Sequence, residues 1–272
     1  MSPEEISRYS RQLLLPEIGV EGQEKLKNAS VLLVGAGGLG SPVAMYLAAA
    51  GVGTIGVADF DQVDLSNLQR QVAYKTGDIG GKKAEIASKL LKEMNPLVNI
   101  LTYTTALTAE NALDMLKDYQ IAVDCSDNFQ TRYLLSDACV LSGKPYVYGS
   151  VSELKGQTSF FYAKEGPCYR CLYPEPPPPA LKPSCLTSGV LGVLHGVIGC
   201  IMANEVLKFI IKGSAIMGRL LLFNAWETRF DEIEIKKNGD CPICGKNPSI
   251  KTLINCYKDM EGACDSIASR FC

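Results

Sequence analysis

Residues 30–40 read SVLLVGAGGLG, an apolar run that leads directly into a glycine-rich turn. The run has the length and the branched residues of a buried strand, and the ten residues after it have the composition of a helix. Gly35, Gly37 and Gly40 give the spacing G-x-G-x-x-G, with Gly38 inside it. Glycines at this spacing let the backbone approach a phosphate or ribose, and the N-terminus of the next helix favours negative charge. The stretch therefore predicts a nucleotide-binding strand, turn and helix.

Segments typical of strands and of helices alternate after this unit. We expect strands at residues 54–58, 99–103, 121–124 and 145–151, and helices at residues 80–94, 109–116 and 130–141. Such alternation is typical of an α/β fold, a doubly wound and mostly parallel sheet with a Rossmann-like nucleotide-binding core. A long helix is expected at residues 188–211, and further strands at residues 157–163, 219–223 and 230–235. These last strands are expected to be antiparallel.

The chain is expected to form one domain over residues 1–248. Its parts are an N-terminal helical arm over residues 1–28, the nucleotide-binding core over residues 29–150 and a C-terminal part over residues 151–248, followed by a tail over residues 249–272. Four consecutive prolines, Pro176 to Pro179, cannot join a helix or an inner strand. Residues 174–183 are therefore expected to be extended and exposed.

The composition is that of an ordinary soluble globular protein, with 47% hydrophobic and 21% charged residues in a chain of 272. A formal net charge of −2 gives no field that attracts nucleic acid or an anionic membrane, so neither is expected as a partner. The first residues are charged and lack the apolar segment of a signal peptide. Polar residues interrupt the apolar stretch 188–211, which predicts a buried helix with His195 as a packing residue.

Charged residues follow the expected strands where a doubly wound sheet binds its ligands. Asp59 ends one strand, where a carboxylate can accept hydrogen bonds from ribose hydroxyls. Asn67, Arg70 and Lys83 come next, and Asp127 follows a later strand. Cations here suit phosphates and a carboxylate can hold Mg²⁺, as nucleotidyl transfer from ATP requires. A dinucleotide dehydrogenase does not need this set, and the sequence lacks the G-x-x-x-x-G-K-[ST] motif of Walker-type ATPases.

Four of the eleven cysteines form two C-x2-C pairs, Cys168 with Cys171 and Cys241 with Cys244. Two such pairs in a chain of this size indicate a structural zinc site in the reducing cytoplasm. Because four thiolates leave no position for water, the metal is expected to stabilise the fold without taking part in catalysis. Of the other cysteines, Cys125, Cys139 and Cys200 are expected to pack in apolar elements, and Cys256, Cys264 and Cys272 in the tail are expected to have no role.

Seven motifs occur in one order along the chain: RYSRQ (8–12), GAGGLG (35–40), DFDQVDLSNLQRQ (59–71), I-G-x-x-K (79–83), DCSDN (124–128), CYRC (168–171) and CPIC (241–244). Together they resemble the ThiF/MoeB/HesA group of ubiquitin-activating-enzyme-like adenylyltransferases over about residues 4–248. The resemblance implies ATP-dependent adenylation of the C-terminal carboxylate of a small ubiquitin-like sulfur carrier that ends in Gly-Gly. It also implies a homodimer, and makes residues 151–248 the part that binds carrier and zinc.

The resemblance further implies roles for single residues. Asp59 binds ribose, Asn67, Arg70 and Lys83 contact the phosphates, Asp127 holds Mg²⁺, Arg11 reaches the ATP of the partner subunit, and Asp61 and Arg132 belong to the same ATP site. Cys185, between the prolines and the long helix, has two interpretations. It is either the thiol that captures the activated carrier or an exposed bystander.

Three other functions would share some of these features. An NAD-dependent oxidoreductase would share the glycine turn, and a non-catalytic scaffold would share the zinc site and the dimer. A tRNA-modifying dehydratase would share the nucleotide domain but would need a basic surface. The sequence leaves the pathway open among molybdopterin, thiamine, tRNA thiolation, cysteine and natural-product synthesis. The tail is shorter than a rhodanese domain, so an external sulfur donor is expected if sulfur is transferred.

Overall fold

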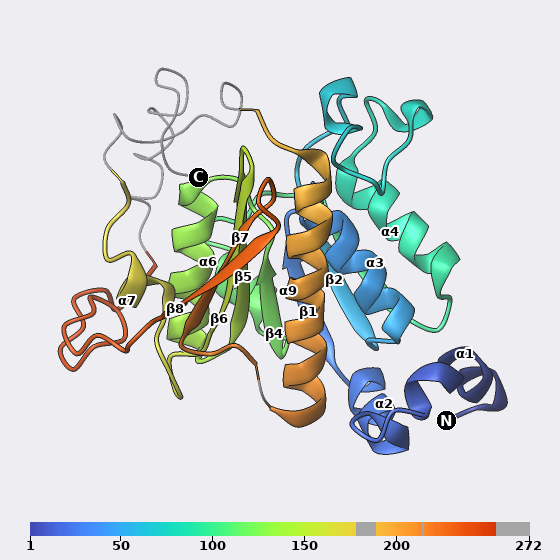
Figure 1. The fold of residues 1–272 in the computed structure, drawn as a ribbon, viewed down its shortest axis with the longest axis horizontal. Coiled ribbons are helices and arrows are strands. Elements are labelled where there is room, and N and C mark those ends of the chain that lie inside the picture. The colour runs from blue at the N-terminus through green and yellow to red at the C-terminus, as the bar shows by residue number, and fades with distance from the viewer. Residues whose placement is uncertain (178–188, 214, 254–272) are drawn as a thin grey trace.

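The computed structural model describes residues 1–177, 189–213 and 215–253, and the strands in this part form one sheet (Figure 1). The strands lie in the order β3-β2-β1-β4-β5-β6-β7-β8. Their bounds are β1 Ser30–Val34, β2 Thr54–Ala58, β3 Asn99–Tyr103, β4 Ile121–Asp124, β5 Tyr146–Ser152, β6 Lys155–Phe161, β7 Arg219–Asn224 and β8 Arg229–Glu234. Neighbours from β3 to β5 pair in parallel and those from β5 to β8 pair antiparallel. The predicted fold class is confirmed.

The helices surround this sheet. Their bounds are α1 Pro3–Leu13, α2 Gly19–Lys27, α3 Gly40–Ala50, α4 Lys83–Met94, α5 Ala112–Leu116, α6 Phe129–Ser142, α7 Tyr169–Leu172 and α9 Gly192–Lys212, with short 3-10 turns at η1 Leu65–Asn67 and η2 Thr76–Asp78. Local chemistry fixes several ends. The hydroxyl of Ser2 accepts the backbone N–H of Glu5 at 3.2 Å and caps α1. Gly143, with a φ of 64°, ends α6 in the left-handed conformation that glycine adopts most readily.

Both faces of the sheet are covered. Val31 and Leu33 of β1 pack in a core with α3, α4 and α9, whereas Leu32 and Val34 pack in a second core with α5 and α6. Parallel strands buried on both faces read as continuous apolar runs, which is the pattern of SVLLV. In Figure 1, α1 and α2 lie at one end of the molecule, where α2 contacts α9.

The order of the strands reverses beside β1, and this reversal opens a crevice for a ligand. β2 and β3 lie on one side of β1, and β4 and β5 lie on the other. The connections that leave the carboxyl ends of β1 and β4 therefore run in opposite directions, and open α/β sheets bind their ligands at this point. The glycine turn follows β1 and residues 125–128 follow β4.

Helix α9 is the one helix of the described residues with the length and hydropathy of a membrane span. Half of its apolar window is buried inside the protein, where it packs against α2, α3, β5 and β6. Two polar side chains within it, His195 and Glu205, are buried as well. These contacts are those of a core helix, as the sequence predicted.

Three helices begin later than predicted. α4 begins at Lys83 and not at residue 80, because Gly80 has a φ of 84° and Lys82 forms a β-bridge with Gln62. α9 begins at Gly192 and not at residue 188, since Val190 forms a bridge with Glu153. α5 begins at Ala112, after a turn closed by Thr108 and Asn111. Of the expected extended segment 174–183, only residues 174–177 are described.

Candidate functional site

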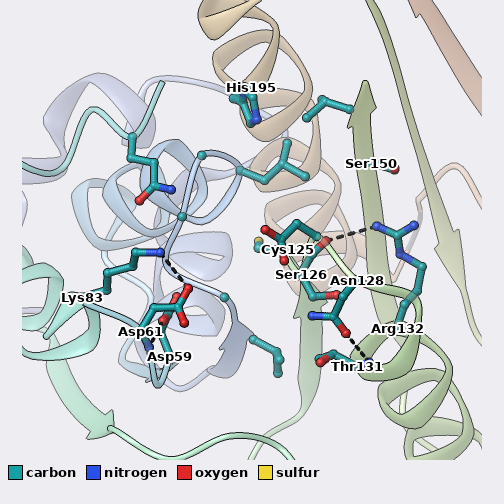
Figure 2. Close-up of a pocket in the computed structure, with 18 of the residues that line it drawn as sticks. Asp59, Asp61, Lys83, Cys125, Ser126, Asn128, Thr131, Arg132, Ser150 and His195 are labelled. Carbon is teal, nitrogen blue, oxygen red and sulfur yellow. Dashed lines mark hydrogen bonds and ion pairs between the residues drawn. The ribbon is translucent and has the colours of Figure 1, made fainter. Parts of the chain in front are cut away.

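A cavity of about 350 Å³ lies at the carboxyl ends of β1, β2 and β4 (Figure 2). Segments far apart in the sequence line it: the glycine turn, residues 58–61, 69–71, 105–107, 125–132 and 150–152, and the start of α9. Of the predicted site residues, those that line the cavity are Gly35, Gly37, Gly38, Asp59, Asp61, Arg70, Lys83, Asp127 and Arg132. The fold thus brings together most of the predicted nucleotide site.

The glycines of the turn serve different purposes. Gly35 has a φ of 97°, and a Cβ there would lie 2.6 Å from the carbonyl oxygen of Cys125. A Cβ at Gly40 would lie 2.1 Å from the carbonyl oxygen of Gly35, so this glycine lets α3 start against the turn and does not itself line the cavity. A Cβ at Gly38 would lie 2.2 Å from Cδ2 of His195. Only hydrogen fits at these three positions.

Asp59 is held in place by backbone groups. Its Oδ2 accepts the N–H of Ala36 at 2.7 Å and its Oδ1 accepts the N–H of Asp61 at 2.8 Å. Burial raises the pKa of Asp59, and these hydrogen bonds and the charge of Lys83 oppose that rise. The carboxylate is therefore fixed at the end of β2 and faces the cavity, where it can accept hydrogen bonds from hydroxyl groups.

Lys83, at the first position of α4, points its ammonium group toward the glycine turn. Nζ lies 2.9 Å from Oδ2 of Asp61, and the lysine side chain is 7% exposed against 49% for the aspartate. The hydroxyl of Tyr74 donates to the carbonyl of Ala36 at 2.7 Å, and the carbonyl of Lys83 lies 3.3 Å from it. This tyrosine ties the start of α4 to the turn, so the side chain of Lys83 is held next to the turn, where it could contact an anionic ligand.

Asn67 and Arg70 lie on one short segment but differ in placement. Oδ1 of Asn67 accepts the N–H of Asp64 at 3.2 Å, and its carbonyl accepts the N–H groups of Arg70 and Gln71 at 3.0 and 2.9 Å. Asn67 is buried and does not line the cavity. Arg70 lines it, with Nη1 donating to the carbonyl of Ser66 at 2.8 Å. In this structure Asn67 shapes the loop that presents the arginine.

Asp127 occupies a turn between β4 and α6 that its neighbours fix on both sides. Oδ1 of Asp124 accepts the backbone N–H of Ser126 at 3.0 Å and its hydroxyl at 2.6 Å. Asn128 caps α6, with Oδ1 accepting the N–H of Thr131 at 2.8 Å. The Asp127 side chain, between Ser126 and Asn128, is exposed and lines the cavity.

Arg132 supports the same turn from inside the protein. Nη2 donates to the carbonyl of Ser126 at 3.1 Å, and Nε lies 3.6 Å from Oδ2 of Asp124. Its guanidinium lies over the rings of Phe129 and Tyr148, at 5.5 and 5.0 Å. Burial raises the pKa of Asp124, and the charge of Arg132 opposes that rise. The arginine thus fixes the backbone beside Asp127 while it lines the cavity.

His195 is buried, as predicted for a packing residue, and it also lines the cavity. Nδ1 lies 3.3 Å from the carbonyl of Gly192, and the ring packs against Gly38. Burial lowers the pKa of His195 to about 4, a shift that the charge of Arg70 reinforces. The imidazole is therefore neutral at pH 7.

Arg11 and Cys185 complete the residues predicted for the ATP and carrier site. Arg11 is exposed on α1 and does not line the cavity of its own chain. Cys185 lies outside the described residues, as do the tail cysteines Cys256, Cys264 and Cys272. Cys125 and Cys139 are buried as predicted, but Cys200 is exposed, so its packing role was wrong. Cys200 lies on the outer face of α9. Because this helix is apolar on nearly all sides, its composition alone does not show which side is buried.

The cysteines of the two C-x2-C pairs form one cluster, although about 70 residues separate them. Their Sγ atoms all lie within 4.8 Å of one another. Measured separations are 3.8 Å for Cys168 and Cys171, 3.5 Å for Cys168 and Cys241, and 3.4 Å for Cys171 and Cys244. Zinc–sulfur bonds of about 2.3 Å in a tetrahedron place sulfurs about 3.8 Å apart. The donor set and its spacing fit a four-thiolate metal site.

A model of the ThiF family matches residues 9–243. The chain belongs to the ThiF family. The sulfur carrier protein adenylyltransferase of Thermus thermophilus is 50% identical over 267 residues, which cover 96% of this ThiF-family chain and 97% of that protein. The adenylyltransferase and sulfurtransferase MOCS3 of Culex quinquefasciatus is 50% identical over 253 residues, 92% of this chain and 58% of that protein. The chain thus spans about three fifths of this second relative.

A solved structure of MccB from E. coli shares the fold of this ThiF-family chain, with a TM-score of 0.78 at 24% identity. The match covers 91% of this chain and 76% of MccB. The resemblance read from the motifs is confirmed, and so is the enzyme class, adenylyltransferase.

Several lining residues of this ThiF-family site were not predicted. They are Gln69 and Gln71 beside Arg70, Thr105 to Leu107 after β3, and Ser150 to Ser152 at the end of β5. The glutamines stand within the DFDQVDLSNLQRQ motif, which was the signal available for them. The other two groups come from strand ends without a motif. Only the order of the strands in the sheet shows that these ends meet.

Proposed function

We propose that this ThiF-family chain uses ATP to adenylate the C-terminal carboxylate of a small ubiquitin-like sulfur-carrier protein in the cytoplasm. One observation carries the proposal. The glycine turn, Asp59, Lys83, Arg70 and Asp127 come from separate segments and meet in one cavity. The relative from Thermus thermophilus matches this chain over nearly the whole length of both proteins. It is named a sulfur carrier protein adenylyltransferase.

In this proposal ATP lies along the cavity with its ribose at Asp59 and its phosphates toward Lys83 and Arg70. Asp59 offers carboxylate oxygens at the end of β2, and Lys83 and Arg70 offer positive charge near the turn. The N-terminus of α3, which follows the glycine turn directly, adds the positive end of the helix dipole, which favours anions. The segment 105–107 and Phe129 border the part of the cavity left for the base.

Asp127 would hold the Mg²⁺ ion that accompanies ATP. Its carboxylate is exposed to the cavity, and no hydrogen bond or ion pair of its side chain occurs within the described residues. Carboxylate oxygen is the donor that Mg²⁺ prefers, so the residue fits the ion. The ion would neutralise phosphate charge.

The proposed reaction needs positioning more than proton transfer. A carboxylate oxygen of the last carrier residue attacks the α-phosphorus of ATP. The bond from that phosphorus to the bridging oxygen of the β-phosphate breaks, and pyrophosphate departs. The product that remains is the acyl-adenylate of the carrier. Because the nucleophile is already an anion, no general base is required, and the protein has to bring two anions together and balance their charge.

Capture of the carrier on Cys185 is a second proposed step. The thiolate would attack the acyl carbon of the acyl-adenylate, release AMP and form a thioester, with the thiol proton passing to solvent. Cys185 stands four positions before Gly189, which lines the cavity. An adduct of chain and carrier that added thiol or hydroxylamine cleaves, and that is absent in Cys185→Ser, is the result expected on a non-reducing gel. The sulfur would then come from an external donor.

We also assign a structural Zn²⁺ to Cys168, Cys171, Cys241 and Cys244. The cluster joins α7 to the segment after β8, so a metal there would tie the C-terminal part of the chain to β6 and α6. In the part of the chain that the structure describes, these thiols form no disulfide. A closed set of four thiolates stabilises a fold and does not catalyse.

Family membership favours adenylation over the alternatives. An NAD-dependent oxidoreductase needs neither Lys83 nor Arg70 at its phosphates, and a scaffold without activity would not need Asp127. All three side chains stand at the cavity.

The test is ATP–pyrophosphate exchange by the purified protein with Mg²⁺ and a panel of carriers that end in Gly-Gly. We expect exchange with one carrier and a loss of about a hundredfold or more in Asp127→Asn. Asp114→Asn is the matched control, because Asp114 is exposed on α5 away from the cavity. Exchange that persists in Asp127→Asn, or that no carrier supports, would contradict the proposal.

A further inference from the structure

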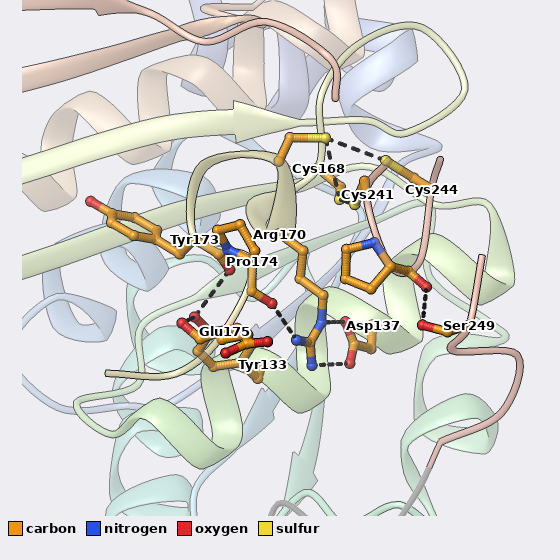
Figure 3. Close-up of polar contacts among 12 residues, drawn as sticks. Tyr133, Asp137, Cys168, Arg170, Tyr173, Pro174, Glu175, Cys241, Cys244 and Ser249 are labelled. Atoms are coloured by element: carbon orange, nitrogen blue, oxygen red, sulfur yellow. Dashed lines mark hydrogen bonds and ion pairs between the residues drawn. The ribbon is translucent and has the colours of Figure 1, made fainter. Parts of the chain in front are cut away.

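The four-cysteine site lies against helix α6, whose first turn enters the ATP cavity. The two residues between Cys168 and Cys171, Tyr169 and Arg170, are buried, with exposed fractions of 1% and 6%. Figure 3 shows Arg170 directed from α7 toward Asp137 of α6. A residue between two metal ligands is fixed at its backbone when the metal is bound. Arg170 is thus a rigid connection between the cysteines and this helix.

The contact of Arg170 with Asp137 is bidentate. Nε donates to Oδ1 at 2.7 Å and Nη2 donates to Oδ2 at 2.8 Å. The Asp137 side chain is 0% exposed and that of Arg170 is 8% exposed. Two parallel bonds between planar groups fix the angle of approach as well as the distance, which a lysine cannot do.

A second set of contacts ties the same helix to the residues that follow the cysteines. The guanidinium of Arg170 lies 4.6 Å from the ring of Tyr133, one turn before Asp137, and its Nη1 donates to the carbonyl of Pro174 at 2.9 Å. The Tyr133 hydroxyl lies 3.1 and 2.8 Å from the carbonyls of Tyr173 and Glu175. Three successive carbonyls are therefore held by two side chains (Figure 3).

The other end of α6 belongs to the cavity. Asn128 caps it, and Phe129, Thr131 and Arg132 of its first turn line the cavity next to Asp127. An aromatic path leads to the same place: Tyr169 packs on Tyr133 and Tyr148 with ring centroids 5.1 and 5.2 Å apart. The Arg132 guanidinium lies 5.0 Å over the Tyr148 ring. Both residues between the cysteines thus connect to the turn that carries Asp127.

Stability alone does not require this pair. A buried ion pair gives up so much hydration that an apolar pair of similar size is often equally stable. What the ionic pair adds is one defined orientation. We propose that Arg170 and Asp137 form a latch through which the four-cysteine metal site positions the first turn of α6, and with it Asp127 and Arg132, in the ATP cavity. The proposal rests on the function proposed above, and makes Arg170 a positioning residue.

The test separates orientation from stability with a double variant, Arg170→Met with Asp137→Leu. It removes both charges, so no unpaired ion stays buried, but it also removes the two parallel bonds. The matched control is Arg219→Met with Glu232→Leu, which removes an exposed arginine–carboxylate pair of 3.0 Å between β7 and β8. For each protein the zinc content, the melting temperature, the Kd for ATP by calorimetry and the exchange kinetics are measured.

We expect the latch variant to keep its zinc and its melting temperature while the Kd for ATP rises about tenfold and kcat for exchange falls. The control variant, Arg219→Met with Glu232→Leu, should change neither the Kd for ATP nor kcat for exchange. Wild-type ATP affinity and exchange in a zinc-loaded latch variant would overturn the proposal. If the latch variant does not fold, Arg170→Lys, which keeps the charge but not the two parallel bonds, takes its place with the same expected rise in Kd.

Removal of the metal gives a second test that does not depend on the carrier. Chelation should raise the Kd for ATP of the wild-type protein and should add nothing in the latch variant, because the metal acts through the latch. An equal loss of ATP affinity on chelation in the wild-type protein and in the latch variant would overturn the proposal. If no carrier supports exchange while these ATP affinities behave as expected, the adenylation proposal fails and the latch stands.

Discussion

At the scale of single residues, Lys83 carries a positive charge at the cavity, and we propose that this charge acts on the phosphates of ATP. Its ammonium group is nearly buried and has Asp61 as its partner, but that carboxylate is half exposed and can turn to solvent. Lys83→Met should therefore leave the fold intact and lower kcat/KM for exchange about a hundredfold, because charge on the phosphates is no longer balanced. The neighbouring Lys82→Met, which loses only an exposed pair with Glu85, should have wild-type kinetics. Similar losses in both variants would show that Lys83 does not act on the phosphates.

His195 gives the protein a measurable acid sensitivity. Burial lowers its pKa to about 4, from an ordinary value of 6.5, so folding favours the neutral ring. The stabilisation is complete above pH 6.5 and is lost as the pH falls toward 4, because the unfolded chain then binds the extra proton. Between pH 7.5 and 5 the free energy of unfolding should fall by about 2 kcal/mol through this group.

Urea unfolding of wild-type and His195→Leu proteins at both pH values isolates this effect, because the carboxylates of Asp59 and Asp124 titrate in both. We expect the stability difference between the two proteins to shift by about 2 kcal/mol in favour of the variant at pH 5. A difference independent of pH would mean that the imidazole is not held neutral.

At the scale of elements, the cysteines of the two C-x2-C pairs bring the segment after β8 together with α7. The segment after β8 has few buried apolar residues besides Cys241 and Ile243. Its attachment would therefore depend on the Zn²⁺ ion that we propose for the four cysteines. Cys171→Ser should lose the zinc and at least about 4 kcal/mol of unfolding free energy. Cys200→Ser, which alters an exposed thiol on α9, should lose neither. Metal analysis and thermal unfolding check this, and full zinc occupancy in Cys171→Ser would refute the assignment.

At the scale of the whole molecule, Arg11 is a predicted site residue that does not line the cavity of its own chain. It lies exposed on α1, next to the exposed apolar residues Leu14 and Leu15. We propose a homodimer in which this arm reaches the cavity of the partner. Arg11→Ala and Asp127→Asn should each be inactive, and mixed after exchange of subunits they should recover about one quarter of wild-type activity, since half of the dimers then hold one complete site.

The recovered activity should appear only after the subunits are allowed to exchange, and a double variant with both changes in one chain should recover nothing when mixed with itself. A mixture that stays inactive while native mass spectrometry shows mixed dimers would place Arg11 outside the active site.

The local features of this protein follow from its amino-acid sequence. Apolar runs, the glycine turn and capping residues are patterns of near neighbours, so the alternating strands and helices, the glycines of the turn and the paired cysteines could be predicted. Helix starts such as that of α4 were missed because the left-handed Gly80 and the bridge of Lys82 depend on a distant strand segment at Gln62. Cys200 was misplaced because an apolar helix does not reveal which side faces the core.

Which of these features lie together depends on how the strands and helices pack. The strand order put the ends of β1, β2 and β4 at one cavity, gave Asn67 a loop-shaping place behind Arg70, and turned His195 from a packing residue into one that also lines the site. It also joined Arg170 to Asp137, 33 residues apart, in a buried ion pair. The CYRC motif contains Arg170 but does not predict its partner. The spacing of residues along the chain sets the periodicity of helices and strands and the positions of turns. Contact between distant side chains depends instead on how the layers of the fold pack.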